Sequence, residues 1–157
     1  MANRIDYNNN RISFNEYFME IAKIVSKRSG CNRRKVGAVI VSQDNQILAT
    51  GYNASPVGIV DCINTDKCLR VFSDQAKDLD KCMSVHAEIN AIAQCAKYGI
   101  PIEGARIYVT TFPCINCMKA IINAGIKEIV YLENYNDHLS WQLANHARIK
   151  VQKYSEM

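Results

Sequence analysis

Two short segments decide how this chain is interpreted: Val85-His86-Ala87-Glu88 and Phe112-Pro113-Cys114-Ile115-Asn116-Cys117. They supply one histidine and two cysteines, all of them metal ligands, and one carboxylate that the metal does not need. A zinc ion held by one histidine and two thiolates keeps one tetrahedral position open, which is typical of catalytic rather than structural zinc. At that position the metal lowers the pKa of bound water to about 7. The sequence therefore predicts a catalytic zinc at His86, Cys114 and Cys117, with Glu88 placed to move protons between water and a substrate.

The spacing of these residues fits two helix starts. We expect one helix over residues 85–98, with Ser84 as its N-cap, and another over residues 114–124. The positive end of a helix dipole and its free N–H groups stabilise the thiolates, and two cysteines three residues apart share one helical face. In a regular helix His86 and Glu88 point to different sides, so the carboxylate has to curl round the first turn. His86 must be neutral to bind zinc, so binding should fail in acid.

Strand-like and helical patterns alternate around these two segments. Ser13-Phe14-Asn15-Glu16 is a capping box that opens a helix, and apolar residues at helical spacing (Phe14, Tyr17, Phe18, Ile21, Ile24 and Val25) predict that one face of this helix enters the core. Further patterns predict strands over residues 36–42, 46–51, 106–110, 127–132 and 149–152, and a last helix over residues 138–147. This alternation predicts a layered α/β sheet with helices on both faces, in a single domain over residues 1–157.

The composition is that of an ordinary globular protein, with 48% hydrophobic and 22% charged residues. The net charge of +4 is mild, and the one basic run, Arg33-Arg34-Lys35, is either a solvated loop or an anion site. A broad nucleic-acid face needs more positive charge than this. The sequence has no apolar run of transmembrane length and no charged-then-apolar leader, which predicts a soluble, cytoplasmic chain. The seven cysteines are then reduced thiols, apart from those on the metal.

Several longer motifs carry a family resemblance. They are Lys35-Val36-Gly37-Ala38-Val39, Thr50-Gly51-Tyr52-Asn53 followed by Pro56 and Gly58, and Ala124-Gly125-Ile126-Lys127. His-x-Glu followed by Pro-Cys-x-x-Cys is the signature of zinc nucleobase deaminases. With these motifs the chain resembles, over nearly its whole length, the zinc-dependent cytidine and deoxycytidylate deaminase superfamily, and most closely its deoxycytidylate (dCMP) deaminases. The resemblance implies a three-layer α/β/α sandwich with a mixed five-stranded sheet, the cytidine deaminase fold.

The resemblance also implies a reaction, the hydrolytic deamination of dCMP to dUMP and ammonia. Glu88 would take a proton from water and deliver it first to N3 of the base and then to the leaving amine. Members of the family are commonly homo-hexamers that dCTP activates and dTTP inhibits, usually with Mg²⁺ on the effector triphosphate. The expected partners are thus small nucleotides, with neither nucleic acid nor membrane, in the cytoplasm (of the host, for a viral protein).

Substrate and effector contacts follow from the resemblance by position. Asn53 would hold the deoxyribose hydroxyl, although Asn after a strand is also an ordinary turn residue. The backbone of Ala87 would touch the base, and Tyr135 would lie near the 5′-phosphate. Arg33, Arg34 and Lys35 are candidates for the phosphate by charge and position. The loop that would border an effector site between subunits contributes Gly51, Tyr52, Asn53, Ser55 and Gly58.

Three alternatives remain open at this stage. Cys31, Cys62, Cys68 and Cys82 either hold a second, structural zinc, as in some relatives, or are reduced thiols. The second alternative is that the chain is another zinc deaminase, which acts on cytidine, cytosine or a tRNA adenosine. A tRNA enzyme, however, should show a stronger basic face. The third alternative is a zinc-stabilised binding module without activity. Such a module would not need the proton-transfer group Glu88.

Overall fold

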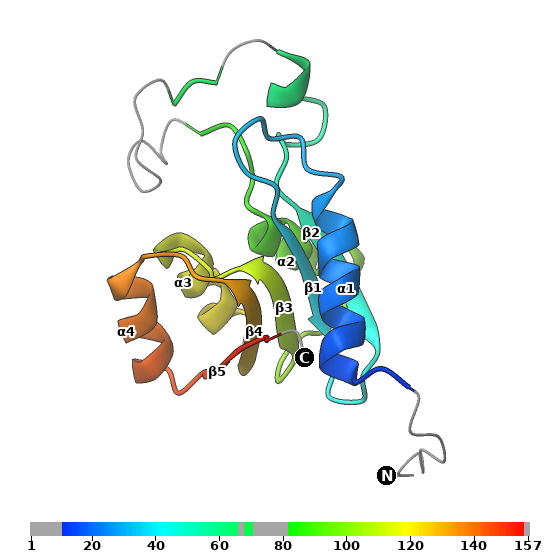
Figure 1. Ribbon diagram of the computed structural model, residues 1–157, viewed down its shortest axis with the longest axis vertical. Helices are drawn as coiled ribbons and strands as arrows, with labels where there is room; N and C mark the ends of the chain where they lie inside the picture. The colour runs from blue at the N-terminus through cyan, green and yellow to red at the C-terminus, as the bar shows by residue number, and fades with distance from the viewer. Residues whose placement is uncertain (1–10, 66–67, 71–81, 156–157) are drawn as a thin grey trace.

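A five-stranded mixed sheet in the order β2-β1-β3-β4-β5 organises the protein (Figure 1). The computed structural model describes residues 11–65, 68–70 and 82–155. Strand β1 is antiparallel to both β2 and β3, whereas β3, β4 and β5 are parallel. The strands are β1 (Gly37–Val41), β2 (Ile47–Tyr52), β3 (Arg106–Thr111), β4 (Glu128–Glu133) and β5 (Lys150–Lys153). The expected mixed sheet is therefore confirmed.

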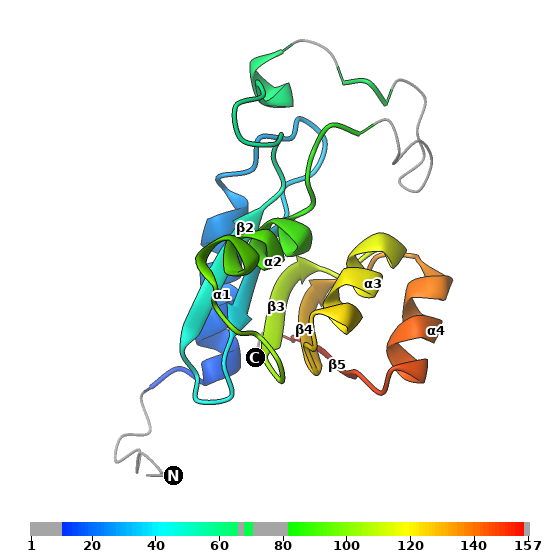
Figure 2. The same cartoon turned by 180° about the vertical axis from the view of Figure 1, so that it is seen from behind.

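Helices cover both faces of this sheet, as expected (Figures 1 and 2). Helix α1 (Phe14–Ser26) lies on one face, and α2 (Ala87–Tyr98) and α3 (Ile115–Asn123) lie on the other, with α4 (His138–His146) packed against α3. Strand β1 shows the reason for three layers. Ala38 and Ile40 belong to the core under α2 and α3, whereas Val39 and Val41 belong to the core under α1. A strand buried on both faces reads as a continuous apolar run, which is what β1 shows.

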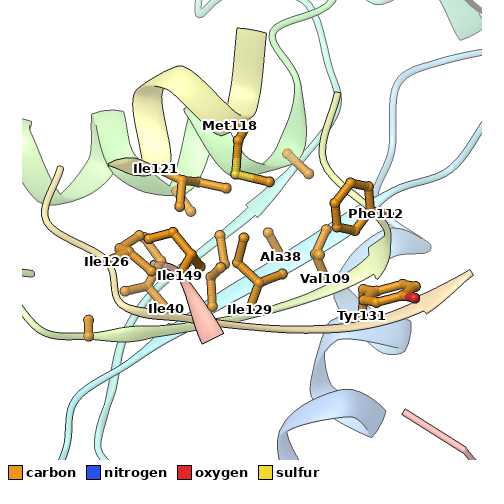
Figure 3. Packing of buried hydrophobic residues seen from close by; sticks show 14 of the residues in the cluster. Ala38, Ile40, Val109, Phe112, Met118, Ile121, Ile126, Ile129, Tyr131 and Ile149 are labelled. Atoms are coloured by element: carbon orange, nitrogen blue, oxygen red, sulfur yellow. The ribbon is translucent and has the colours of Figure 1, made fainter. Parts of the chain in front are cut away.

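The larger core lies between the sheet and α2 and α3 (Figure 3). Ile40, Ile129, Met118 and Ile121 are fully buried there. Each such side chain contributes about 1.5–3 kcal/mol when it leaves water. This packing fixes the position of α2 and α3, whose N-terminal ends carry the predicted metal ligands.

Helix α1 differs from the expectation. Its buried residues are Phe18, Met19 and Ala22, whereas Phe14 and Ile24 are 49% and 57% exposed. The apolar stripe of the helix is wider than its contact with the sheet, so the prediction that all of it enters the core was wrong. Within the described residues, no helix is both long enough and apolar enough to span a membrane.

A long segment separates β2 from α2. It starts and ends at an isolated antiparallel bridge, in which Val85 N–H donates to the carbonyl of Ala54 at 2.8 Å. Beyond the bridge lies a short 3₁₀ helix, η1 (Cys62–Asn64). Figure 1 shows the part of this segment around η1 lying past the end of the sheet. Residues 66–67 and 71–81 of this segment fall outside the described residues.

Candidate active site

One edge of the sheet collects the predicted functional residues. Because β1 is antiparallel to its neighbours, the start of β1 lies beside the ends of β2 and β3, as the pairings Gly37–Tyr52 and Ala38–Val109 show. The end of β4 lies at the same edge, since Thr111 pairs with Glu133. A cavity of about 410 Å³ opens there. Its volume is in the range of small-molecule sites, about 300–1,000 Å³.

Three metal ligands meet beside this cavity, and two of them, His86 and Cys114, line its wall. Nδ1 of His86 lies 3.4 Å from Sγ of Cys114 and 3.4 Å from Sγ of Cys117. The three ligand atoms all lie within 4.8 Å of one another. Tetrahedral zinc, with bonds of about 2.0–2.1 Å to nitrogen and 2.3 Å to sulfur, places such atoms about 3.5 Å apart. The donor set and its spacing therefore fit zinc, and three protein ligands leave one tetrahedral position for water or a substrate.

The local backbone explains how two helix starts make this site. His86 is the N-cap of α2 and Cys114 is the N-cap of α3, and both have extended ψ angles, 153° and 169°. The helices predicted from residues 85 and 114 thus begin at Ala87 and Ile115, because the ligand before each helix leaves the helical conformation. Cys117 lies in the first turn of α3, where free N–H groups stabilise anionic sulfur.

The two thiols have very different proton affinities without metal. A hydrogen bond from Cys117 lowers the pKa of Cys114 to about 4, and a bond with His86 adds to this. Donating that hydrogen bond, together with burial, raises the pKa of Cys117 well above its usual value. The bond with Cys114 also raises the pKa of His86. One thiolate is thus ready for a cation, and metal binding has to release the protons of the other ligands.

Glu88 lies beside the three metal ligands. Its side chain is only 4% exposed, yet it lines the cavity. Burial raises its pKa to about 7, and the thiol of Cys117 lies within hydrogen-bonding reach of its carboxylate. A carboxyl group with a pKa near neutrality is suited to general acid and base catalysis. The extended backbone of His86 resolves the expected difficulty, because ligand and carboxylate do not have to share a helical face.

Asn53 lies in the cavity wall, where the resemblance implied a contact with the substrate. Both polar atoms of its side chain, however, make hydrogen bonds to the protein backbone. Its Oδ1 accepts a 2.8 Å hydrogen bond from the backbone N–H of Val36, and its Nδ2 donates to the carbonyl of Arg34 at 2.7 Å. These bonds tie the end of β2 to the segment before β1. Ala87 and Tyr135 also line the cavity.

The three residues of the basic run, Arg33-Arg34-Lys35, do not all reach the cavity. Arg33 and Arg34 line the cavity, whereas Lys35 is exposed and is not among the lining residues. A third cation, Arg70, lines the same cavity. Sequence reasoning missed Arg70, because its only signal was a single charge inside an irregular segment.

The predicted effector loop has mixed surroundings. Gly51 is buried, and a Cβ placed on it would lie 2.1 Å from the carbonyl oxygen of Ala87. Glycine is needed there for close contact between β2 and α2. Ser55 Oγ is buried, Tyr52 is half-buried, and Gly58 is exposed with a φ of +87°.

The four cysteines considered for a second zinc gather near one another. Cys31, Cys68 and Cys82 are close enough to Cys62 to add to the effect of burial in raising its pKa. Within the described residues, however, only His86, Cys114 and Cys117 form a group of three ligands compact enough for one metal. As the structure stands, the four are free thiols, two of which, Cys31 and Cys82, line the cavity.

Comparison with known proteins agrees with this site. Residues 12–133 match the family described as the cytidine and deoxycytidylate deaminase zinc-binding region. The chain is 47% identical to ComE operon protein 2 of Bacillus subtilis over 128 residues, 82% of this chain and 64% of that protein. It is 38% identical to the deoxycytidylate deaminase of Mycobacterium phage D29 over 125 residues, 77% of this chain and 95% of that one.

A solved structure is similar as well. The dCMP deaminase of the cyanophage S-TIM5, in complex with dCMP and dUMP, superposes with a TM-score of 0.74 at 29% identity, covering 92% of this chain and all of that one (100%). The chain spans about half the length of two yeast deoxycytidylate deaminases that it matches, 48% and 46%. From the matched region and the assembled histidine and cysteine ligands, we conclude that the chain belongs to the zinc-binding cytidine and deoxycytidylate deaminase family.

Proposed function

We propose that this protein catalyses the hydrolytic deamination of dCMP to dUMP and ammonia. One observation carries the proposal: buried Glu88 lines the same cavity as His86 and Cys114, which form one ligand group with Cys117. A binding module needs the metal ligands but has no use for a carboxyl group of neutral pKa beside them. The names of the relatives support dCMP as the substrate.

The chemistry divides between metal and protein. Zinc, when bound, supplies an activated water at neutral pH and a Lewis acid for the developing charge. Glu88 would accept one proton of the attacking water and deliver it to N3 of the base, and would then carry the second proton of that water to the amine, which leaves as ammonia, so one carboxyl group serves as both base and acid. The N-terminal turn of α2, which begins at Ala87, presents backbone N–H groups for the base carbonyl. The buried position of Glu88 keeps bulk water away from this proton transfer.

Regulation and assembly form the finer part of the proposal. We propose activation by dCTP and inhibition by dTTP, with Mg²⁺ on the triphosphate, in a homo-hexamer whose effector site includes the loop from Gly51 to Gly58. Exposed apolar side chains support an assembly, because large apolar patches mark interaction sites. They gather on the segment beyond β2: Val57, Ile59, Val60, Ile63 and Leu69. We also propose that residues 1–157 work as one deaminase domain in the cytoplasm, where thiolate ligands stay reduced.

Ultraviolet monitoring of zinc-loaded protein tests the reaction. Deamination of dCMP, deoxycytidine and dCTP is followed with and without dCTP, dTTP and Mg²⁺. We expect consumption of dCMP with equimolar ammonia, faster with dCTP and slower with dTTP. Protein with one zinc per chain that releases no ammonia from dCMP under any of these conditions contradicts the proposed reaction. Equal rates with and without the effectors contradict only the proposed regulation.

A further inference from the structure

The metal ligand Cys114 lies just before α3, where helical hydrogen bonds do not yet hold the backbone. It is the N-cap of the helix and has an extended ψ of 169°. Its carbonyl oxygen accepts the first helical hydrogen bond, from the N–H of Met118 at 2.8 Å. The first N–H groups of a helix, beginning here with that of Ile115, have no acceptor within the helix. Groups from elsewhere in the chain therefore have to bind the peptides around Cys114.

The carboxylate of Asp137 supplies one of these groups and caps two helices at once. Asp137 is the N-cap of α4, and its Oδ1 accepts a 3.0 Å hydrogen bond from the N–H of Ser140. Its Oδ2 accepts a 2.8 Å hydrogen bond from the N–H of Ile115, the first residue of α3. Aspartate is a preferred N-cap residue, which explains the first bond. The second bond joins residues 22 positions apart and acts on the peptide group that follows Cys114.

The peptide group on the other side of Cys114 is bound from the same helix. Oγ of Ser140 donates a 2.7 Å hydrogen bond to the carbonyl oxygen of Pro113. Ser140 is fully buried, and a hydrogen bond is stronger where water is excluded. Helix α4 lies beside α3 in both views (Figures 1 and 2). The two peptide groups that flank Cys114 are therefore both tied to the start of α4.

The other two ligands are held in different ways. Cys117 is buried within the first turn of α3, so the helix itself fixes its backbone. His86 follows Val85, whose N–H and carbonyl both pair with Ala54 in the isolated bridge. Among the three ligands, Cys114 is thus the one whose position depends on Asp137 and Ser140.

We propose that Asp137 and Ser140 are positioning residues of the metal site: by holding the peptide groups on both sides of Cys114, they direct its thiolate toward zinc and raise the affinity for the metal. A ligand that is already in place loses less conformational freedom when it binds. Neither residue lines the cavity, so each acts through Cys114 and not on a substrate. The inference rests on the metal site and is independent of which nucleotide the enzyme uses.

The test measures how tightly the zinc-loaded protein keeps its metal, without any substrate. Zinc transfer to a chromophoric chelator gives the zinc affinity of the wild type and of Asp137→Ala, Asp137→Asn and Ser140→Ala. Partners that orient metal ligands typically change metal affinity by about 10- to 100-fold, and we expect a loss of this size in both Ala variants. Asp137→Asn keeps one oxygen acceptor and should lose less.

The matched control is Ala144→Gly. Ala144 is buried on α4, and glycine destabilises a helix interior, but this change removes none of the hydrogen bonds around Cys114. Its zinc affinity should stay at the wild-type value although its unfolding midpoint in urea falls. Cobalt in place of zinc gives a second readout, because its visible absorption depends on the arrangement of the ligands. We expect an altered cobalt spectrum in Asp137→Ala and the wild-type spectrum in Ala144→Gly.

The outcomes separate positioning from general stability. A merely structural role predicts that zinc affinity falls in step with the unfolding midpoint in every variant, including Ala144→Gly, and that result overturns the inference. Wild-type zinc affinity in Asp137→Ala or in Ser140→Ala overturns it for that residue. If Asp137→Ala does not fold, Asp137→Asn and Ser140→Ala decide by the same criteria. A wild type that binds no zinc contradicts the metal site and this inference together.

Discussion

The side chain of Asn53 joins two chain segments at the active-site edge by donating a 2.7 Å hydrogen bond to the carbonyl of Arg34. The same amide accepts a bond from the N–H of Val36, and Asn53 is only 7% exposed. The start of β1 is thereby fixed to the end of β2, next to the metal ligands. In the sequence, Asn53 can be explained as an ordinary turn residue. In the folded protein, its side chain holds the segment that carries Arg34 against the end of β2.

We expect Asn53→Ala to destabilise the protein by about 1–3 kcal/mol, because it leaves the half-buried N–H of Val36 without this acceptor and the carbonyl of Arg34 with only the 3.5 Å contact from Oγ of Ser29. Urea unfolding of the zinc-loaded protein measures this change. Asn134→Ala, at an exposed position near the same edge, is the matched control and should have little effect. Equal stability of the two variants would show that the side-chain hydrogen bonds of Asn53 do not stabilise the protein.

Replacing Glu88 by Gln should abolish turnover while zinc stays bound. The amide keeps the size of the side chain but cannot take up the water proton, and positioned acid–base groups contribute about 10²–10⁴-fold to rate. Zinc per chain by elemental analysis and ammonia release from dCMP are the two measurements. A variant that retains both zinc and activity would falsify the assigned role of Glu88.

Cys117→Ser should weaken zinc binding and lower the unfolding temperature of protein purified with zinc. Cys117 is fully buried and supplies one of three ligands, and metal bound only by the folded state stabilises that state. Cys95→Ala is the control, since Cys95 is buried in the core but is not part of the ligand group. For both variants, zinc content and melting are followed with and without a chelator. Normal zinc content in Cys117→Ser would rule out this ligand assignment.

Gly51→Ala tests the contact between β2 and α2. The added Cβ would lie 2.1 Å from the carbonyl oxygen of Ala87 and 2.5 Å from the backbone nitrogen of Ala91, so the start of α2 must move. We expect a loss of about 1–3 kcal/mol from overpacking, and lower activity because Glu88 moves with the helix. Thr50→Ala, at the exposed neighbouring position, should change neither stability nor rate. Identical results for the two variants would contradict the close contact.

Tyr108 should make stability depend on pH in alkali. Burial raises the pKa of its phenol in the folded protein above the usual value of about 10. Above pH 10 the unfolded chain loses this proton while the folded protein keeps it, so stability should fall as pH rises from about 10 toward the folded-state pKa. Below pH 10 the proton is present in both states and adds no slope.

Tyr108→Phe should remove this part of the alkaline slope. At neutral pH the variant should lose about 0.5–1.5 kcal/mol, because the phenol donates a 2.8 Å hydrogen bond to Oδ1 of Asn15. Urea midpoints measured from pH 8 to pH 11 give both quantities. The same slope in the variant and the wild type would show that other groups cause it.

The sequence by itself determined the metal-ligand group and the layering of this protein. Ligand identity follows from residue type, so the residue types and their spacing were enough to name His86, Cys114, Cys117 and Glu88. The strand and helix periods likewise predicted a sheet covered on both faces. These signals are local, because each depends on residues a few positions apart. Their limits are local too: the helix bounds shifted where His86 and Cys114 turn the backbone out of the helix.

Only the tertiary structure decided which other residues belong to the site. Arg33 and Arg70 are 37 positions apart, and Arg34 and Glu133 are 99 apart, so no spacing rule links them. They meet because β1 runs antiparallel to β2 and β3, which brings the segment before β1 to the edge where β2, β3 and β4 end. Lys35 is not among the residues that line the cavity, whereas Arg70 is, with its carbonyl oxygen bonded to Arg33. The sequence shows which residues are charged, but the position of these arginines relative to the zinc ligands depends on the tertiary structure.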